Sequence, residues 1–379
     1  MRLLALAAVP LLLAGCTQVI DFIKGTPSGP KPAALPTLTA AKEVRVLWSA
    51  NVGSADRFVF SPGLAGDAVY AASRSGTVAR LDAASGAERW RVNVDAQLSG
   101  GVGTDGRTAA VATDEGEVIA VDAGTGAVRW RARVSSEVLS PPAVGGGLVV
   151  VRAIDNRIFA FGEADGKRRW VYQRAPSTLF VRSPTGLTIV NDLVFAGFSG
   201  GKLAAIALAN GNVRWEATVA LPKGATELER VTDVVGAPVV QGREVCAAAY
   251  QGRVACYEAA TGRQIWVREV SSLTGISLDA GYAFVSDDRG GVHALDRSTG
   301  RSVWKQDRLS HRQLSLPRPA GEAVVVGDLE GHVHFMARDS GAFISRYSTS
   351  GGPVRAAPQP LAGGVLVQTQ NGGLFALSP

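Results

Sequence analysis

All seven tryptophans of the chain stand in phase with one recurring motif. The motif has the form Gly-x-Val-x-Ala-Leu-Asp-x-x-Thr-Gly-x-x-x-Trp. Its clear copies cover residues 76–90, 116–130, 252–266 and 291–304, weaker copies cover 156–170 and 201–215, and a degenerate copy at 331–345 ends in serine. Successive tryptophans are 38 to 51 residues apart. A unit that recurs at such an interval indicates a repeat architecture, in which each unit buries its faces against its neighbours.

Each repeat predicts four short β-strands. A Pro-containing entry such as 141–144 precedes an apolar run such as 148–151, which is followed by an alternating strand such as 118–121 and by the tryptophan strand. The Asp-x-x-Thr-Gly stretch between the last two strands is turn chemistry, because the aspartate can close an Asx turn and the glycine tolerates a positive φ. We therefore predict an all-β chain folded as a β-propeller of four-stranded antiparallel blades.

The two ends of the repeat array set the number of blades. Residues 373–377 form the third strand of a unit that lacks a tryptophan strand, whereas residues 44–48 form a tryptophan strand with no unit before it. Together the two fragments complete one blade, which closes the ring and removes edges that would invite aggregation. Seven complete units and this shared one predict an eight-bladed propeller over residues 44–379.

The N-terminus is typical of a bacterial lipoprotein signal. Arg2 precedes an apolar stretch over 3–13, which is too short to span a bilayer, and residues 13–16 read Leu-Ala-Gly-Cys. We expect residues 1–15 to be a signal peptide and Cys16 to carry the lipids; an ordinary signal peptide with a chance cysteine is the alternative. Several acyl chains on Cys16 would hold the membrane stably, which one chain does only marginally.

Residues 16–43 are then the lipidated cysteine and its tether. The stretch 17–43 is rich in Pro, Gly, Ala and Thr and lacks a core pattern, which predicts a flexible segment with an r.m.s. reach of roughly 30 Å. The residue after Cys16 is Thr17 rather than an aspartate. By the sorting habit of bacterial lipoproteins, this points to the periplasmic face of the outer membrane.

Several classes of function find no support in the sequence. The net charge of +6 comes from scattered Lys and Arg residues with one tight cluster at 167–169, which does not favour nucleic-acid binding. His332 and His334 alternate on one strand face, but the spacing offers no third metal ligand. No nucleophile elbow or catalytic triad is evident. We predict a protein without catalytic activity, metal or cofactor.

Two cysteines besides Cys16 flank a turn that contains Gly252. A three-residue loop with Gly252 in the left-handed conformation would place Cys246 directly opposite Cys256. In an oxidising periplasm a cross-strand disulfide is one outcome, and two buried reduced cysteines are the other. We expect a structural staple without redox function if the disulfide forms.

Two consecutive repeat intervals are stretched, to 45 and then 51 residues. In both, the extra residues follow the tryptophan strand, at 174–183 and 221–235, so both insertions should project from the same face of adjacent blades. Leu179, Val181 and Arg182 in the first insertion have the anchor-plus-arginine chemistry of protein interfaces. The alternative is a strand extension in which these apolar residues pack into the core and Arg182 caps them.

The second insertion predicts a short amphipathic turn beside the first. Its residues Glu229 and Arg230 are charged, and Leu228 and Val231 supply an apolar side. Long loops in otherwise regular repeats are where function tends to concentrate. We therefore take the two insertions together as the candidate partner-binding site.

The repeat resembles the pyrroloquinoline-quinone-type propeller repeat, whose founding members are alcohol and glucose dehydrogenases. Those enzymes are longer and place a quinone against a tryptophan on the ring axis, whereas every tryptophan here belongs to the blade repeat. The whole chain is similar to the BamB family, the β-propeller lipoproteins of the outer-membrane β-barrel assembly machinery. The segments that carry this resemblance are 179–182, 227–233, 309–312 and 326–331, with the lipobox and the closing N-terminal strand.

The resemblance implies a non-catalytic scaffold that binds the periplasmic polypeptide-transport (POTRA) repeats of the outer-membrane insertase, a BamA-like protein. It also implies assistance to the folding and insertion of outer-membrane proteins, which are a further expected partner in their unfolded form. The family's contacts, carried over by position, fall on Leu179, Val181, Arg182 and Asp233, and the family has a second acidic residue where this chain has Val235. Two alternatives stay open: a lipoprotein propeller that binds another envelope protein, and a propeller that binds a quinone or sugar.

Overall fold

The computed structural model describes residues 30–38, 42–175 and 179–379. The signal peptide, Cys16, Thr17 and most of the tether lie outside these residues. Ala33–Pro379 forms one compact unit, and the other unit, Met1–Pro32, is described only at its last residues. Over the described ranges the secondary structure is β-strand and turn, and no helix there has the length and hydropathy to cross a membrane.

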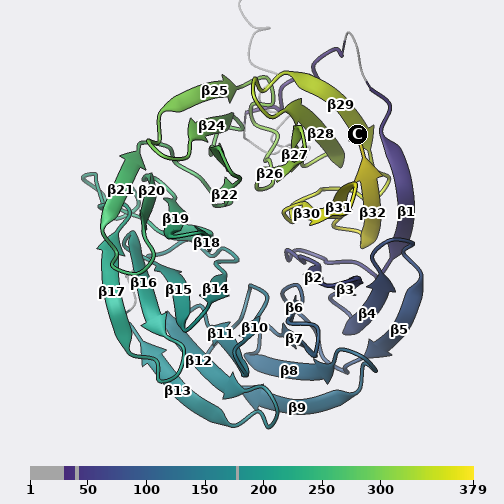
Figure 1. Ribbon diagram of the computed structural model, residues 1–379, viewed down its shortest axis with the longest axis vertical. Helices are drawn as coiled ribbons and strands as arrows, with labels where there is room; N and C mark the ends of the chain where they lie inside the picture. Colours follow the sequence, from purple (N-terminus) through teal and green to yellow (C-terminus); the bar gives the residue numbers. More distant parts are fainter. Residues whose placement is uncertain (1–29, 39–41, 176–178) are drawn as a thin grey trace, which may run out of the picture. The chain divides into compact units, whose positions relative to one another are not determined.

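The unit Ala33–Pro379 is a closed ring of eight four-stranded antiparallel sheets, as the sequence predicts (Figure 1). Seven blades each use four consecutive strands. The strands of blades 1 to 4 are β2 (Gly63–Ala65), β3 (Ala68–Ala72), β4 (Thr77–Asp82), β5 (Glu88–Asn93); β6 (Gly103–Thr104), β7 (Thr108–Ala112), β8 (Glu117–Asp122), β9 (Val128–Arg133); β10 (Ala143–Gly145), β11 (Leu148–Arg152), β12 (Arg157–Gly162), β13 (Arg168–Gln173); and β14 (Leu187–Val190), β15 (Leu193–Phe198), β16 (Lys202–Ala207), β17 (Val213–Thr218).

Blades 5 to 7 continue in the same order, and the eighth blade joins the two ends of the chain. The strands of blades 5 to 7 are β18 (Val234–Gln241), β19 (Glu244–Ala249), β20 (Val254–Glu258), β21 (Gln264–Arg268); β22 (Ser277–Leu278), β23 (Tyr282–Ser286), β24 (Val292–Asp296), β25 (Ser302–Gln306); and β26 (Arg318–Ala320), β27 (Ala323–Gly327), β28 (His332–Ala337), β29 (Phe343–Ser348). The closing blade consists of β30 (Gln359–Leu361), β31 (Gly364–Gln368), β32 (Gly373–Ser378) and β1 (Arg45–Asn51).

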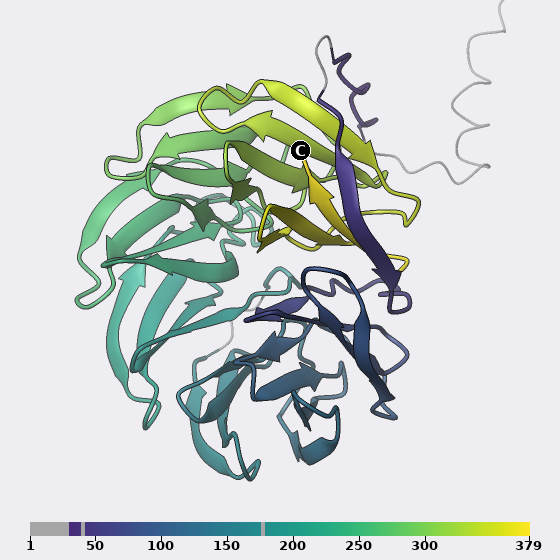
Figure 2. The same cartoon turned by 45° about the vertical axis from the view of Figure 1, so that its right-hand side comes forward.

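The closing blade confirms the predicted joining of the chain ends. Strand β1 lies antiparallel to β32, with Trp48 opposite Ala376 and Asn51 opposite Gly373. Figure 2 shows the purple β1 strand running alongside the yellow β32 strand. The first tryptophan therefore occupies the same outer position as the tryptophans of the seven complete blades.

Burial is greatest in the two middle strands of each blade, because the innermost strands are only half-buried and the outer strands are largely exposed. All five residues of β3 and of β7 are buried, whereas the outer strand β5 has the pattern of an exposed surface with Trp90 turned partly inward. Because the two middle strands are covered on both faces by neighbouring blades, they read as continuous apolar runs. The core thus lies between the blades, in clusters that each draw on two adjacent sheets.

Each tryptophan locks its blade to the next one by two contacts. The indole Nε1–H donates to the carbonyl oxygen of the residue that follows the third strand of the next blade, as in Trp130 to Glu163 O at 2.8 Å. The same ring lies flat against the turn glycine of that blade. The seven interlocking pairs are Trp48–Gly86, Trp90–Gly126, Trp130–Gly166, Trp170–Gly211, Trp215–Gly262, Trp266–Gly300 and Trp304–Gly341. A Cβ added to any of these glycines would lie 2.5 to 2.8 Å from the ring. The glycine of the motif is therefore needed for the contact between blades as well as for the turn.

One junction of the ring has no such interlock. Blade 7 carries Ser345 where the other blades carry tryptophan, and the hydroxyl of Ser345 is buried without a hydrogen-bond partner. In the closing blade, the turn that would receive the ring does not exist, because the third strand β32 and the fourth strand β1 are the two ends of the propeller chain. A tryptophan is therefore not needed in blade 7, because the closing blade has no turn to receive its ring. We call this junction between blade 7 and the closing blade the seam.

The cysteine register is as predicted, but the turn conformation is not. Cys246 lies opposite Cys256, and the two form a disulfide with a Cα–Cα distance of 4.1 Å. The left-handed residue of the turn is Gln251, with φ 46°, and not Gly252. Glycine is required at 252 for space instead, because a Cβ there would lie 2.6 Å from that of Ala220.

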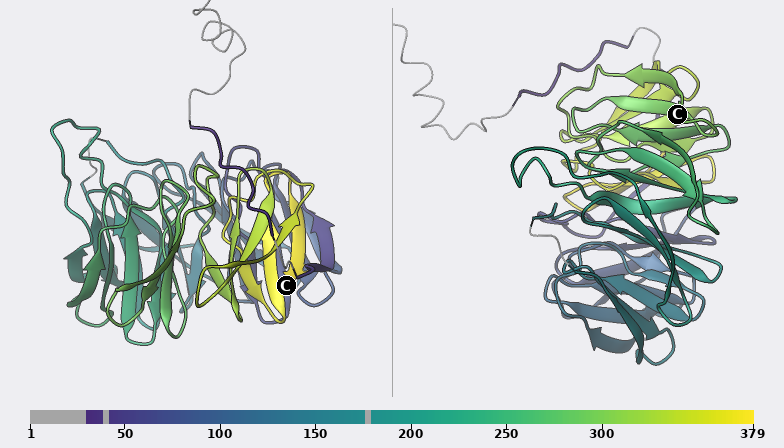
Figure 3. Two further views of the ribbon diagram at one scale, coloured as in Figure 1. Left: turned by 90° about the horizontal axis from the view of Figure 1, so that it is seen from above. Right: turned by 90° about the vertical axis from the view of Figure 1, so that its left-hand side faces the viewer.

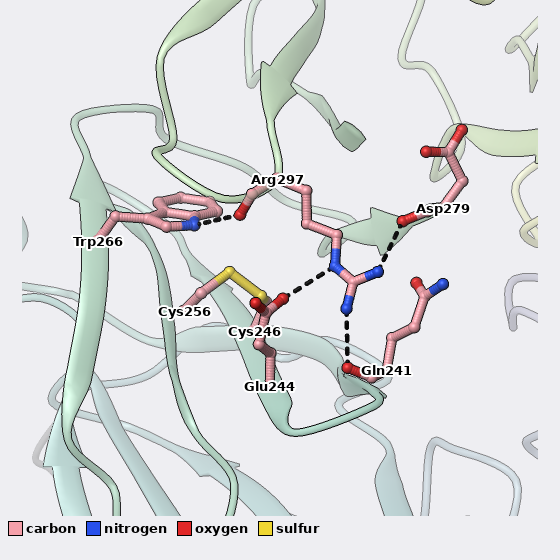
Figure 4. The surroundings of a disulfide bond; sticks show 7 residues. All are labelled: Gln241, Glu244, Cys246, Cys256, Trp266, Asp279 and Arg297. Atoms are coloured by element: carbon pink, nitrogen blue, oxygen red, sulfur yellow. Dashed lines mark hydrogen bonds and ion pairs between the residues drawn. A yellow bond between two sulfur atoms is a disulfide. The ribbon is translucent and has the colours of Figure 1, made fainter. Parts of the chain in front are cut away.

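The disulfide stands next to a second link between blades 5 and 6. The guanidinium of Arg297 donates to the Glu244 carboxylate at 2.8 Å and to the carbonyl oxygens of Gln241 and Asp279 at 2.9 and 3.2 Å (Figure 4). Its own carbonyl accepts the indole N–H of Trp266 at 2.7 Å. The disulfide within blade 5 thus lies next to the hydrogen bonds that link blade 5 to blade 6.

The predicted flexible tether is wrong for part of its length. Residues Ala33–Leu38 contact blade 7, where the carbonyl oxygens of Ala33 and Pro36 accept hydrogen bonds from Arg312 and Arg346 at 2.8 and 2.7 Å. The composition of this stretch suggested a free chain because it lacks a core pattern. Its contacts use backbone carbonyls, which leave no trace in the side-chain pattern.

We expect Gly166→Ala to destabilise the protein more than Gly147→Ala. Both glycines have positive φ, 63° and 77°, so both variants carry a backbone cost of about 1–2 kcal/mol. Only at Gly166 would the new Cβ meet the Trp130 ring, at 2.6 Å, which adds about 1–3 kcal/mol, whereas Gly147 has open space. Urea unfolding of the two variants measures the difference, and equal midpoints would contradict the interlock.

We expect no free thiol in the mature, denatured and unreduced protein, and labelling of Cys246 and Cys256 only after reduction. The crosslink closes a loop with a sequence separation of 10, so its reduction should lower the free energy of unfolding by about 2–3 kcal/mol. Mass spectrometry after alkylation counts the labelled thiols. Two labelled cysteines before reduction would remove the disulfide.

Candidate functional site

Both insertions lie on the propeller face that carries the connections from the fourth strand of one blade to the first strand of the next, which we call the loop face. The first insertion runs between β13 and β14, and the second between β17 and β18. Both project from the same side of the ring in Figure 3. The second insertion is shorter than predicted, because Val234 and Val235 already belong to β18.

The first insertion is not the strand extension that the alternative required. Residues 179–182 have no strand structure, and the side chains of Leu179 and Phe180 are 45% and 40% exposed. Val181 is half-buried, and its backbone rather than its side chain makes the firmest contact of the segment. The loop therefore presents two adjacent apolar side chains to solvent.

Asp233, a predicted partner contact, is buried and holds the first insertion in place. Its exposure is 5%, and its carboxylate accepts hydrogen bonds from the backbone N–H of Val181 at 2.5 Å and of Gly200 at 3.3 Å. Its own carbonyl accepts from the N–H of Tyr250 at 2.8 Å. One residue thus joins the first insertion to turns of blades 4 and 5, and we assign it a positioning role.

The nearby cation is Arg152 of β11. Burial raises the pKa of the Asp233 carboxyl, and hydrogen bonds from Val181 and Gly200 and the charge of Arg152 only partly oppose this. Burial likewise lowers the pKa of Arg152 to about 10, although Asp233 counteracts the shift. The guanidinium of Arg152 donates to the carbonyl of Gly197 and to the amide oxygen of Asn156. The loop is thus anchored by a buried carboxylate whose charge is only partly compensated.

Glu229, another predicted contact, also works within the protein. Its carboxylate accepts from the N–H of Ala225 at 2.8 Å and of Thr226 at 3.1 Å, and the Thr226 hydroxyl accepts from the N–H of Glu229 at 3.2 Å. This reciprocal Thr-x-x-Glu arrangement is a capping box. Backbone hydrogen bonds, that of Thr226 first, lower the pKa of the Glu229 carboxyl. The spacing was visible in the sequence, and reading it as a capping box would have identified this role.

The turn held by Glu229 projects one leucine. Leu228 is 72% exposed, more than any other large apolar side chain among the described residues, whereas Val231 is buried. Arg230 is exposed beside it. The predicted apolar side of the turn is therefore divided, with Leu228 facing solvent and Val231 packed inside. Val235 lies buried in β18 and does not contribute to this surface, so the position where the family has an acidic residue is internal here.

Arg182 is half-exposed and already has an intramolecular partner. Its Nη2 lies 2.5 Å from the Glu137 carboxylate, which comes from the connection between blades 2 and 3. Its guanidinium also stands 5.9 Å from the centre of the Phe58 ring, in the connection that enters blade 1. The first insertion thus reaches across several blade junctions on the loop face. A partner carboxylate at Arg182 would compete with Glu137 for the guanidinium.

The candidate site offers little room for a small organic ligand. The cavity beneath Phe180 and Val181 measures about 30 Å³, which is room for water rather than for an organic ligand. Among the described side chains, no group of three His, Cys, Asp or Glu could hold a metal ion. His334 is fully buried, with Nε2 2.9 Å from the Asp328 carboxylate.

Comparison with known proteins agrees on one family. The family model described as outer membrane protein assembly factor BamB matches residues 74–306. An outer membrane protein assembly factor BamB from Bordetella pertussis is 46% identical over 91% of this chain and 89% of its own length. The one from Burkholderia pseudomallei is 39% identical over 99% of this chain and 97% of its own length.

Solved structures give the same answer for the fold. The crystal structure of BamB from Moraxella catarrhalis has a TM-score of 0.81 and 28% identity, and covers 89% of this chain and all of that one. The quinohemoprotein alcohol dehydrogenase of Comamonas testosteroni has a TM-score of 0.69 at 12% identity, and this likeness shows the fold alone. The sequence relatives are named as assembly factors, which supports the non-enzymatic role that the sequence predicts.

We expect Asp233→Asn to loosen the first insertion without unfolding the ring. An amide offers one acceptor oxygen in place of two, so either Val181 N–H or Gly200 N–H loses its partner. The backbone amide hydrogen that loses its partner should exchange roughly 5- to 30-fold faster than in the wild type, as expected when local stability falls by about 1–2 kcal/mol. Hydrogen exchange read by NMR measures this, with Asp192→Asn at an exposed turn as control. Unchanged exchange of both amides would contradict the positioning role.

Because burial raises the pKa of Asp233, its ionisation opposes folding. The raised pKa means that the protonated Asp233 carboxyl stabilises the folded protein. This stabilisation is fully present below the ordinary carboxyl pKa and is lost as the pH rises through the raised value. Asp233→Asn should remove this pH dependence from the free energy of unfolding. A pH series of urea unfolding curves for the wild type and the variant tests the sign.

Proposed function

The chain belongs to the family of outer membrane protein assembly factor BamB. From this premise we propose that it is a non-catalytic scaffold that binds the POTRA repeats of a BamA-like insertase through its two insertions. The observation that carries the proposal is the fixed pair of loops on one face. Asp233 and Glu229 hold these loops internally, and the apolar side chains of Leu179, Phe180 and Leu228 remain exposed.

The chemistry of this surface suits a folded protein domain. Rigid apolar anchors surrounded by charged residues are typical of protein interfaces, because they are covered without a large loss of conformational entropy. Leu179 and Leu228 supply the anchors, and Arg182 and Arg230 supply charge beside them. In the proposed complex Arg182 exchanges Glu137 for an acidic side chain of the partner.

The proposal includes a lipid anchor at Cys16 on the periplasmic face of the outer membrane. The lipobox and Thr17 support it from the sequence, and both lie outside the described residues. Anchoring concentrates the propeller next to an insertase in the same membrane, so a modest interface suffices for stable association.

Unfolded outer-membrane proteins are a further proposed partner. The outermost strand ends each sheet, so its outer edge has unpaired backbone groups that an extended chain can join. The charged side chains on β5 and β9, among them Arg91 and Arg131, limit such pairing to short segments. Failure of the free propeller to cross-link to any unfolded barrel protein would remove this part of the proposal.

We expect Arg182→Glu and Leu228→Asp each to weaken co-purification of the insertase from detergent-solubilised envelopes. Truncation of a central anchor or arginine commonly costs more than about 1–2 kcal/mol, which is roughly tenfold or more in affinity. Arg214→Glu on the outer strand β17 is the matched charge control, and circular dichroism checks the fold. The insertase should be recovered normally with this control.

The variant Glu137→Gln sharpens the test of the Arg182 contact. It removes the intramolecular competitor and leaves the arginine in place, so it should strengthen binding of the insertase. If the insertase persists with Arg182→Glu and Leu228→Asp, the family assignment stands but the site lies elsewhere. If wild-type protein recovers no barrel protein with periplasmic repeats, another envelope partner or an axial quinone or sugar replaces the proposal, and ligands that raise the melting temperature would favour the latter.

A further inference from the structure

The described N-terminal segment Ala33–Leu38, which we call the strap, follows the surface of blade 7. The N–H of Ala33 donates to Ser310 O at 2.9 Å, and Ala33 O accepts from Arg312 Nη1 at 2.8 Å. Three residues on, Pro36 O accepts from Arg346 Nη2 at 2.7 Å, and the side chain of Pro36 is buried. The strap is thus held both by hydrogen bonds of its backbone and by burial of the Pro36 side chain.

The two arginines belong to a cluster that is built in advance of the strap. Arg312 is 2% exposed, and its Nε lies 2.7 Å from the Asp328 carboxylate. Its Nη2 bonds Glu330, and Asp328 also faces His334. Burial lowers the pKa of His334, so the neutral ring donates Nε2–H to Asp328 and accepts the Arg346 Nε–H at Nδ1, over 3.3 Å.

The strap completes this cluster. A guanidinium has five donors and loses stability when a buried donor lacks an acceptor. The carboxylates of Asp328 and Glu330 satisfy two sides of Arg312, and Ala33 O satisfies Nη1. The cluster is therefore a site for a backbone carbonyl.

The strap also lies beside the seam. The chain that continues from it reaches the outer strand of blade 7, where Lys42 N–H donates to Ile344 O at 3.1 Å, next to Ser345. This is the junction without a Trp–Gly interlock. Backbone contacts of the N-terminal segment thus occur where the ring has lost its usual link between blades.

The position of the first strap contact fixes where the tether leaves the propeller. Ser310 and Arg312 lie between β25 and β26, in a connection equivalent to those that carry the two insertions. Ala33 therefore starts on the loop face. Figure 3 shows the described N-terminal segment on the same side of the ring as the projecting insertions.

We propose that blade 7 carries a docking surface for the chain's own strap, and that the docked strap turns the loop face toward the membrane. The orientation rests on the lipid anchor of the proposed function; the docking does not. With Ala33 docked, the stretch that composition predicts to be flexible shortens to 17–32, for which the expected r.m.s. reach is roughly 20 Å instead of roughly 30 Å for 17–43. The partner surface is thereby held close to the bilayer that contains the insertase.

The first test measures docking in the full-length protein by hydrogen exchange. The amide of Ala33 should exchange at least roughly tenfold more slowly than in a free peptide, because it is bonded to Ser310 O. Arg346→Ala should remove most of this protection, and Arg355→Ala, an exposed arginine of the next connection, should leave it intact. Free-peptide exchange of Ala33 in the wild type would overturn the docking.

The second test measures orientation of the lipidated protein on vesicles of phosphatidylethanolamine with a minor fraction of phosphatidylglycerol and a lipid energy acceptor. A donor dye is attached through Arg289→Cys on the loop face or Ala164→Cys on the opposite face. Energy transfer should be greater from position 289. Replacement of Ala33–Leu38 by a Gly/Ser segment of equal length should abolish the difference.

The outcomes separate the two ideas. Equal energy transfer from both dyes in the wild type, or a difference that survives replacement of the strap, overturns the orientation. Wild-type protein that does not float with vesicles contradicts the lipid anchor and the orientation with it, while slow exchange of Ala33 would still support docking. Co-purification of the insertase is measured independently, and its loss from wild-type protein would count against the proposed function alone.

Discussion

The indole ring that packs against the turn glycine of the next blade is the contact on which the ring depends. It buries a large aromatic surface and satisfies the indole N–H at the same time, and both effects occur between neighbours and not within a blade. Repetition at seven junctions couples blades that would each be only marginally stable alone. At the eighth junction, between blade 7 and the closing blade, this contact is missing, and the N-terminal segment makes backbone contacts with blade 7 before it enters β1 of the closing blade.

This division leaves one face of the propeller free to vary. The interlocking turns join the third and fourth strands, and antiparallel geometry places them on the face opposite the loop face. Extra residues in the connections on the loop face add only a small loop-closure entropy. The two long insertions and the strap all occur on this face. The Trp–Gly interlocks and the candidate recognition loops therefore lie at opposite ends of the same strands.

The insertions are ordered by two carboxylates, of which Asp233 is buried and Glu229 is exposed. Asp233 binds backbone N–H groups of the first insertion and of a neighbouring turn, and Glu229 closes the second on itself. Such residues resemble surface contacts in a sequence, because acidic side chains in long loops are usually exposed. Their function here is to hold the exposed leucines in position, so replacing them would weaken binding through loop order and not through lost contacts.

The sequence by itself determined the blade number, the closure of the ring, the pairing of Cys246 with Cys256 and the common face of the two insertions. These features follow from local periodicity, because a strand pattern and a turn repeated in phase allow one arrangement of neighbours. Only the tertiary structure decided that Asp233 is internal, that Gln251 takes the left-handed position, and that Ala33 docks on Arg312. Each of these depends on residues far apart in the chain meeting through backbone groups, which carry no sequence pattern.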